Sequence, residues 1–342
     1  MADIFLYGTL RHPPLLEIVL GRGAGRAVPA RLPGHEVRWV AGQPYPMIRA
    51  APDAVAEGLL LPDLSENEMA RLRFYESGFA FDLRPVTVRT GQGARPAEVF
   101  FPDDPGLAPG APWALADWAA RWGALSCHAA REVMDLQGRF TPSELAARFP
   151  MIRARAQSRV LAETMPRPCV GTPGLGRDEV RQRAHRRPYV AHFAMEEAAL
   201  SFRQFDGSMS PVVERTALVA TDAALVLPYD PRRDRVMLLE QFRVGPWLRA
   251  DPRPWCLEPV AGRVDPGETP EATAHREARE EAGLTFSTLH PVSRSYPSPG
   301  CSSEFFHIFV GLTDLPDTTA GHGGLAEEAE DIRLHLFSFD QV

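Results

Sequence analysis

Three glutamates of this sequence have the type and spacing needed to bind a divalent cation. Glu277, Glu280 and Glu281 occupy positions i, i+3 and i+4, so a helix would bring them to one face. A cation would relieve their mutual repulsion, and hard oxygen ligands suit Mg²⁺ or Mn²⁺, which also bridge to substrate phosphates. The alternative is a solvated helix face, for which Arg276 and Arg279 supply counter-charges.

The residues around these glutamates predict a loop followed by a helix. Two glycines and a proline within residues 261–268 indicate sharp turns. Thr269 is the expected N-cap, Pro270 suits the first helical position, and Gly283 is expected to end the helix. Alanines spaced four apart would form one small-residue stripe that packs closely, namely Ala274, Ala278 and Ala282.

The wider spacing of this stretch resembles the Nudix box. Five residues separate Gly262 from Glu268, and seven more separate Glu268 from the segment REAREEAGL at 276–284, so every fixed position of the motif matches. The one soft departure is Ala278, where a larger aliphatic residue is usual. The resemblance implies a hydrolase that splits a nucleoside diphosphate linked to another moiety.

Segments on both sides of the box are similar to the ADP-ribose diphosphatase branch of this family, including its tellurite-resistance-associated members. The similarity covers about residues 190–342 and implies hydrolysis of ADP-ribose to AMP and ribose 5-phosphate. Helix between mixed strands also predicts an α/β/α sandwich with a mixed sheet. The segments that carry the similarity are Phe205–Ser210, Glu240–Arg243, Glu258–Gly262, Ser298–Gly300 and Gly324–Asp331.

The resemblance assigns roles to individual residues. It implies that Mg²⁺, or Mn²⁺, is held by the Ala261 carbonyl, Glu277 and Glu281, with Glu330 joining when substrate is bound. Glu280 lies beside these ligands, while Arg276 and Glu268 mainly support the loop and helix geometry. Glu328 is the candidate base for the attacking water, and Arg215 and Arg243 are expected to contact the pyrophosphate through paired hydrogen bonds. Glu327, Glu328 and Glu330 could instead be solvated loop charges.

The same branch also implies an oligomeric state and a C-terminal helix. It forms homodimers that share sites across subunits through N-terminal strands, here about residues 190–215, so a homodimer is expected. Its members usually continue past the last strand with a helix, whereas this sequence ends at Phe339–Val342. We therefore expect either a naturally shorter protein or a truncated one, with lower stability or weaker dimerisation.

The N-terminal part carries a second set of chemical residues. Asp3–Arg11 predicts a strand that runs into a glycine turn, whose backbone N–H groups could face an anion. With the turn at Gln43–Ile48, the strand at Val55–Leu61 and then Leu72–Glu76 after a short helix, the order resembles the gamma-glutamylcyclotransferase-like family. That family implies a small barrel-like α+β domain over residues 1–105.

In that family the YGTL turn binds the gamma-glutamyl group and one glutamate is the general acid/base of cyclisation. The matching positions are Tyr7, Gly8, Thr9 and Leu10 for binding and Glu76 for catalysis. Apolar walls would raise the pKa of such a carboxylate, and the candidates are Phe74, Tyr75, Phe79 and Phe81. Alternatively, Glu76 is a surface residue of a domain kept for packing or partner contact.

Residues 106–190 are expected to form a helical linker region between this domain and a Nudix domain at 191–342. Helices are predicted near Asp117–Trp122, over Cys127–Leu136, and after the capping sequence Thr141–Glu144. Pro166–Gly176 predicts a flexible break. The basic stretch Arg177–Arg187 is interpreted as a solvated helix rather than a nucleic-acid patch.

Composition excludes several classes of function. The 342 residues carry a net charge of −7, which argues against a surface that coats nucleic acid. No apolar run approaches the length of a membrane helix, and no signal peptide is evident, so a cytoplasmic protein with no membrane partner is expected. The four cysteines form no CxxC pair, which argues against a zinc site or a disulfide framework.

Two hypotheses of different class remain open from the sequence. In the first, the protein is a hydrolase of ADP-ribose with one or two activities. In the second, the N-terminal module and the linker form a non-catalytic scaffold that tethers or regulates the Nudix domain. A Nudix hydrolase of another NDP-sugar or of NADH is the competing enzymatic interpretation.

Overall fold

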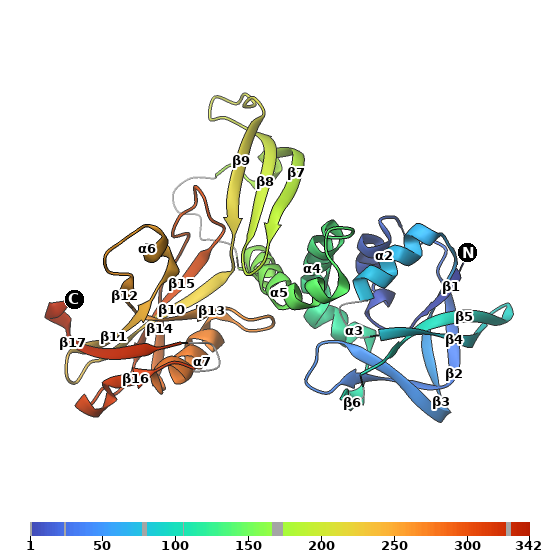
Figure 1. The fold of residues 1–342 in the computed structure, drawn as a ribbon, viewed down its shortest axis with the longest axis horizontal. Coiled ribbons are helices and arrows are strands. Elements are labelled where there is room, and N and C mark those ends of the chain that lie inside the picture. Colours follow the sequence, from blue (N-terminus) through green and yellow to red (C-terminus); the bar gives the residue numbers. More distant parts are fainter. Residues whose placement is uncertain (1, 24, 77–80, 105, 166–173, 326–329) are drawn as a thin grey trace. The chain divides into compact units, whose positions relative to one another are not determined.

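The computed structural model describes residues 2–23, 25–76, 81–104, 106–165, 174–325 and 330–342. The chain divides into two compact units, Met1–Val160 and Leu161–Val342 (Figure 1). No helix among these described ranges is both long enough and apolar enough to cross a membrane.

The first unit is built on a closed β-barrel. Strand β1 pairs with β3 and β5, β3 pairs with β2, β2 pairs with β4, and β4 pairs with β5, which completes the ring, while β6 pairs with the outside of β2. The small barrel expected from the sequence is therefore confirmed. The strands are β1 (Ala2–Leu6), β2 (Val28–Val40), β3 (Pro46–Leu64), β4 (Phe81–Thr90), β5 (Gly93–Pro102) and β6 (Pro109–Pro112).

Inside the barrel, apolar side chains alternate inward along each strand, as a half-buried strand requires. Phe5, Ile48, Leu60 and Val99 are among its fully buried members. Gly58 allows β1 to approach β3, because a Cβ there would lie 2.5 Å from the Leu6 carbonyl oxygen. The core thus fixes where β1 ends and where the turn after it begins.

Helices pack beside the barrel in the same unit, with α4 against both α1 and α2. They are α1 (Pro13–Leu20), α2 (Glu66–Glu76), α3 (Leu115–Trp118), α4 (Ala124–Asp135) and α5 (Pro142–Thr164), with a π-helical turn at Ala119–Gly123. Thr141 and Glu144 cap α5 reciprocally, as the sequence predicts. Leu72–Glu76, expected after a short helix, instead form the end of α2. Most of the expected break, 166–173, lies outside the described residues.

The second unit contains two sheets (Figure 1). The smaller sheet is antiparallel, with β8 (Ala194–Phe202) between β7 (Val180–Val190) and β9 (Val213–Val219). The helix predicted for Arg177–Arg187 is wrong, because most of this stretch forms β7. Its basic side chains pair with acidic residues of the neighbouring strand, as His185 and Arg187 do with Glu196. A strand therefore brings this basic segment opposite its counter-charges.

The larger sheet is mixed, as expected. Strands β10 and β15 run parallel and their other pairings are antiparallel. The strands are β10 (Asp222–Asp230), β11 (Arg235–Phe242), β12 (Trp255–Glu258), β13 (Val260–Arg263), β14 (Thr288–Ser295), β15 (Phe305–Leu312), β16 (Gly321–Gly323) and β17 (Ile332–Ser338). Between β11 and β12 lies the short helix α6 (Val244–Leu248). The full sandwich arrangement stays a prediction.

Helix α7 (Pro270–Ala282) packs against β10 and β13. Ala274 and Ala278 are fully buried in the core beside Val226 and Val260, so the small-residue stripe does bring the helix close to the sheet. Ala278, where the motif usually has a larger aliphatic residue, fits this close packing because its side chain is small. The close packing also sets the position of the acidic face of α7.

Candidate functional sites

The two ends of α7 are fixed by local chemistry that the sequence predicted. Thr269 caps the N-terminus by accepting a hydrogen bond from the Ala272 N–H at 3.2 Å. Gly283 ends the helix in the left-handed conformation, with φ +64°. These two caps fix the length of α7, so Glu277, Glu280 and Glu281 all lie within the helix.

Glu281 is the most deeply buried acid of the group, with 2% of its surface exposed. Its carboxylate accepts a hydrogen bond from the Ala261 N–H at 3.1 Å. Burial, joined by the nearby charges of Glu277 and Glu330, raises the pKa of Glu281 to about 8 against the lowering effect of that N–H. A carboxylate held ionised here needs a positive partner.

Glu277 lies against the backbone of Gly262. A Cβ at position 262 would collide with the Glu277 carboxylate, so only glycine allows this contact. Burial raises the pKa of Glu277 to about 7, although the adjacent Arg276 guanidinium opposes the shift. The structure thus brings Ala261, Glu277 and Glu281 together, as the metal-site hypothesis requires.

Arg276 holds the acidic face of α7 to the preceding loop. Its guanidinium donates to Glu268 at 3.0 Å, to Glu277 at 2.6 Å and to Glu280 at 2.9 Å. It also donates to the Arg263 carbonyl at 3.1 Å. Burial lowers the pKa of Arg276, but these carboxylates outweigh burial and raise it above its ordinary value. Glu280 therefore serves as a partner of Arg276 in this state, beside the two buried acids.

The loop after β16 brings a fourth carboxylate near the site. The Gly324 N–H donates to the Glu281 carbonyl at 3.2 Å, and the Glu330 charge acts on both Glu277 and Glu281. Among the described residues, no three His, Cys, Asp or Glu side chains converge as ligands of one ion. Glu328, the expected base, lies outside the described residues.

The two arginines expected to bind substrate are placed differently. Arg243 follows β11 and makes a two-pronged ion pair with Glu258, from Nη2 to Oε2 at 2.7 Å and from Nε to Oε1 at 3.1 Å, and the charges of Glu281 and Glu330 act on it. Arg215 is exposed on β9 of the smaller sheet, where it donates to the Glu214 carbonyl at 2.9 Å. Glu258 is the partner that sequence reasoning missed, since nothing in its spacing marks it as the anchor of Arg243.

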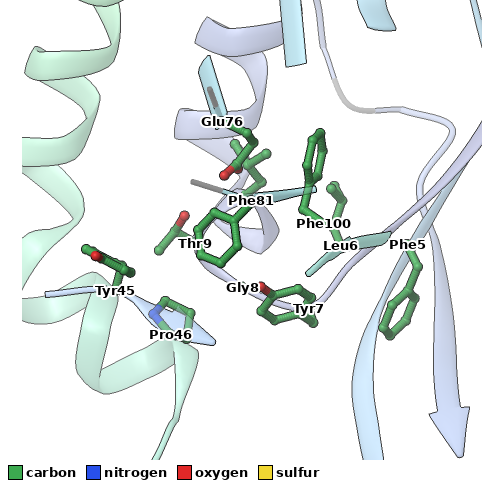
Figure 2. A pocket seen from close by; sticks show the side chains of 11 residues that line it. Phe5, Leu6, Tyr7, Gly8, Thr9, Tyr45, Pro46, Glu76, Phe81 and Phe100 are labelled. Carbon is green, nitrogen blue, oxygen red and sulfur yellow. The ribbon is translucent and has the colours of Figure 1, made fainter. Parts of the chain in front are cut away.

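The first unit contains a cavity at the end of β1 (Figure 2). About 450 Å³ of empty space, including its open mouth, lies between residues of the YGTL turn, the barrel strands and the end of α2. All four residues predicted to bind the gamma-glutamyl group line it. The lining residues are Phe5, Leu6, Tyr7, Gly8, Thr9, Leu10, Tyr45, Pro46, Glu76, Phe81 and Phe100.

Glu76, the predicted acid/base, is at the end of α2 and directs its carboxylate toward Thr9 and Phe81 (Figure 2). Burial among apolar groups raises its pKa to about 8. Of the four walls expected from the sequence, Phe81 lines the cavity, Phe74 and Tyr75 do not, and Phe79 lies outside the described residues. Phe5 of β1, Phe100 of β5 and Tyr7, which directly follows β1, also line the cavity.

Comparison with known proteins finds one domain family in each part of the chain. Residues 219–342 match the NUDIX domain, and residues 4–120 match gamma-glutamyl cyclotransferase, AIG2-like. An ADP-ribose pyrophosphatase of Escherichia coli is 41% identical over 168 residues, which are 49% of this chain and 79% of that protein. A GDP-mannose pyrophosphatase of Cronobacter sakazakii is 35% identical over 34% of this chain and 61% of its own length.

One solved structure, described as an ADP compounds hydrolase, matches 49% of this chain and 82% of its own with 21% identity and a TM-score of 0.37. The ADP-ribose pyrophosphatase of Escherichia coli shows the family through its 41% identity over 79% of its length. The chain belongs to the Nudix family and is a pyrophosphatase. Its N-terminal part carries an AIG2-like gamma-glutamyl cyclotransferase domain.

Proposed function

We propose that the second unit hydrolyses ADP-ribose to AMP and ribose 5-phosphate with Mg²⁺. The observation that carries this proposal is the pair of buried carboxylates, Glu277 and Glu281, held beside Ala261 and Gly262. Relatives named ADP-ribose pyrophosphatase, at 41% identity, support the choice of substrate. The match to a GDP-mannose pyrophosphatase keeps other NDP-sugars as the alternative.

The chemistry of the donor set fits a hard divalent ion. Glu277, Glu281, Glu330 and the Ala261 carbonyl would hold it, and all four offer oxygen ligands. When bound, such an ion neutralises charge on the phosphate oxygens. The two buried acids are the groups whose ionised forms would gain most from it, because burial raises the pKa of each.

The chain's own residues do the remaining work. Arg243, fixed by Glu258, presents a guanidinium suited to a pyrophosphate oxygen pair. In the reaction, water attacks one phosphorus and the bridging P–O bond breaks. Glu328 is our candidate to accept the water's proton. Arg215 would contact substrate in a homodimer, since it lies on β9 of the smaller sheet, and the dimer is part of the proposal.

A substrate panel tests this function. The purified protein with Mg²⁺ or Mn²⁺ would receive ADP-ribose, GDP-mannose, other NDP-sugars and NADH, with products separated by chromatography. We expect the highest kcat/KM for ADP-ribose and the release of AMP. Preference for another conjugate would replace the substrate, while failure to release any nucleoside monophosphate would overturn the hydrolase proposal.

We infer a second function for the first unit, the cyclisation of gamma-glutamyl amides. Its supporting observation is Glu76, the one carboxylic acid among the described residues that line the cavity, where burial raises its pKa beside the YGTL turn. Glu76 takes a proton from the substrate's α-amine as this nitrogen bonds to the γ-carbonyl carbon. The proton then passes to the leaving nitrogen as the amide C–N bond breaks, which releases 5-oxoproline and a free amine.

The scaffold hypothesis gives the opposite result for this unit. Gamma-glutamyl amino acids and gamma-glutamyl amines would be incubated with the full chain, and 5-oxoproline would be quantified. Turnover that disappears in Glu76→Gln supports cyclisation. No turnover of any such compound by the wild-type protein would leave the cavity without chemistry and support a scaffold.

A further inference from the structure

Gln241 of β11 is a buried polar residue whose amide nitrogen lacks a hydrogen bond. The side chain is 6% exposed, and Nε2 has no partner among the residues that the structure describes. The preceding inward-facing residues of the same strand, Met237 and Leu239, are fully buried and apolar. A buried donor without a partner costs free energy, so Gln241 is a candidate to meet an acceptor that arrives with a ligand.

Gln241 lies on the face of the larger sheet that α7 covers. Leu239 belongs to the same buried cluster as Ala278 of α7, and side chains two residues apart on a strand share a face. Arg243 continues this row, because its backbone is extended and its N–H donates to the Pro254 carbonyl across the strand pair. Gln241 therefore stands between the core beneath α7 and the arginine proposed to hold the pyrophosphate.

The ion pair of Arg243 and Glu258 spans the level of Gln241. Glu258 pairs with Leu239, four residues before Arg243, so the ion pair bridges backbone positions about 13 Å apart along the strands. Gln241 and its cross-strand partner Cys256 occupy the level between these positions. The ion pair uses Nε and Nη2 of Arg243, whereas Nη1 donates to no described residue. An unpartnered guanidinium nitrogen and an unpartnered amide nitrogen thus belong to neighbouring side chains of one row.

We propose that Gln241 is a further substrate-binding residue of the hydrolase, and that its amide nitrogen donates to an oxygen of the diphosphate held by Arg243. Phosphate oxygens accept hydrogen bonds, and their charge makes such bonds stronger than neutral ones. Nε2 is covered without substrate, so the terminal amide turns about its last torsion, which is soft, to meet the phosphate. The inference rests on the hydrolysis proposed above, and within Glu240–Arg243 the family resemblance gives a role to Arg243 alone.

Gln241→Met tests this contact, because methionine has a similar length and no donor. We expect KM for ADP-ribose to rise about tenfold or more, as loss of a hydrogen bond to a charged group implies, with little change in kcat. The inhibition constant of inorganic pyrophosphate, which is the diphosphate alone, should rise by a similar factor. Gln241→Glu should raise both constants further, because a carboxylate repels the anion.

Thermal unfolding of the ligand-free protein separates this role from a structural one. Removal of an unpartnered buried donor should leave Gln241→Met at least as stable as wild type, whereas loss of an amide that bonds a buried water would lower the melting temperature. Glu240→Gln is the matched control, because Glu240 directly precedes Gln241 but faces the other side of the sheet and bonds His335. Its KM should equal that of wild type.

Three results would overturn the inference. They are an unchanged KM in Gln241→Met, a lower melting temperature of this variant, and a raised KM for ADP-ribose with unchanged inhibition by pyrophosphate, which would assign the amide to the nucleoside or the distal sugar. If wild-type protein hydrolyses no conjugate, calorimetric binding of ADP with Mg²⁺ decides. Binding that depends on Gln241 keeps the site and rejects only the hydrolysis, and binding that ignores the substitution, or no binding, rejects the site as well.

Discussion

Glu76 and Glu281 have the same raised pKa, about 8, for the same main cause, and yet their surroundings call for different chemistry. Burial is the one resolved influence on Glu76. Glu281, in contrast, feels Glu277, Glu330 and Arg243, and it accepts the Ala261 N–H. A raised pKa therefore identifies a carboxylate whose charged form is disfavoured by its surroundings, but it does not say whether a proton or a cation compensates that charge.

The neighbours supply that information. A lone acid among apolar groups becomes neutral easily and regains its charge easily, which is what proton transfer needs. Acids that share one site with an arginine and a backbone oxygen gain more from a bound cation. Burial of a carboxylate thus favours proton transfer in the first unit and cation binding in the second.

The largest expected effect separates the two acids directly. Glu277→Gln removes a negative ligand while keeping the shape of the side chain. We expect kcat for ADP-ribose to fall on the order of a thousandfold, because charge stabilisation is usually the largest catalytic contribution, while 5-oxoproline formation is unchanged. AMP release at saturating Mg²⁺ measures the effect.

Glu271→Gln is the control for this change, because Glu271 is exposed in the first turn of the same helix. It should retain wild-type activity. If Glu277→Gln kept most of its activity, the acidic face of α7 would not be a metal site.

The reciprocal change tests the first unit. Glu76→Gln should lower 5-oxoproline formation about a hundredfold or more, the usual size of general acid–base catalysis, and leave ADP-ribose hydrolysis intact. Glu66→Gln, exposed at the start of α2, should have no effect on either reaction. Comparable losses in the Glu66 and Glu76 variants would mean that α2 matters for folding rather than for chemistry.

A smaller effect is expected from Arg276→Lys. The lysine keeps the charge but cannot bond Glu268, Glu277 and Glu280 together, so Glu277 would lose part of its orientation. We expect kcat/KM for ADP-ribose to fall on the order of tenfold, as for groups that orient metal ligands, if Glu277 is the ligand proposed above. Arg279→Lys on the exposed side of α7 is the comparison. Equal activity of the two variants would show that the network is dispensable.

The smallest effect concerns stability and pH. The folded protein keeps a proton on Glu76 up to pH about 8, whereas an ordinary glutamate loses it near 4.5. The folded state then binds more protons than the unfolded chain, so stability falls as pH rises through this window. Glu76→Gln cannot ionise and should melt a few degrees higher than wild type at pH 9, with a smaller gap at pH 6, roughly as one or two kcal/mol would produce. A gap that does not change with pH would mean that Glu76 titrates normally.

Local signals allowed much of the acidic site to be predicted. The cap at Thr269, the end at Gly283 and the packing of Ala274 and Ala278 all depend on residues within a few turns of one another. Glu76 and the YGTL turn also meet as expected, although they are far apart in sequence, because the family resemblance supplied their pairing.

Long-range partners account for what the sequence could not show. The strand at 180–190 depends on Glu196 across the sheet, and its basic composition alone suggested a solvated helix. Glu258 of β12 holds Arg243, which directly follows β11, and Phe5 and Phe100 of the barrel strands line the cavity of Glu76. Each of these depends on tertiary neighbours rather than on spacing.

Arg276 has one more consequence, for the behaviour of the protein without its ion. Because it bonds Glu268, Glu277 and Glu280 at once, it joins the loop to α7 whether or not an ion is bound. A chelator should therefore silence the hydrolase without melting it, and returning the ion should restore turnover with no refolding step. The ion-free protein would thus be a folded, inactive form that the ion converts back to the active one.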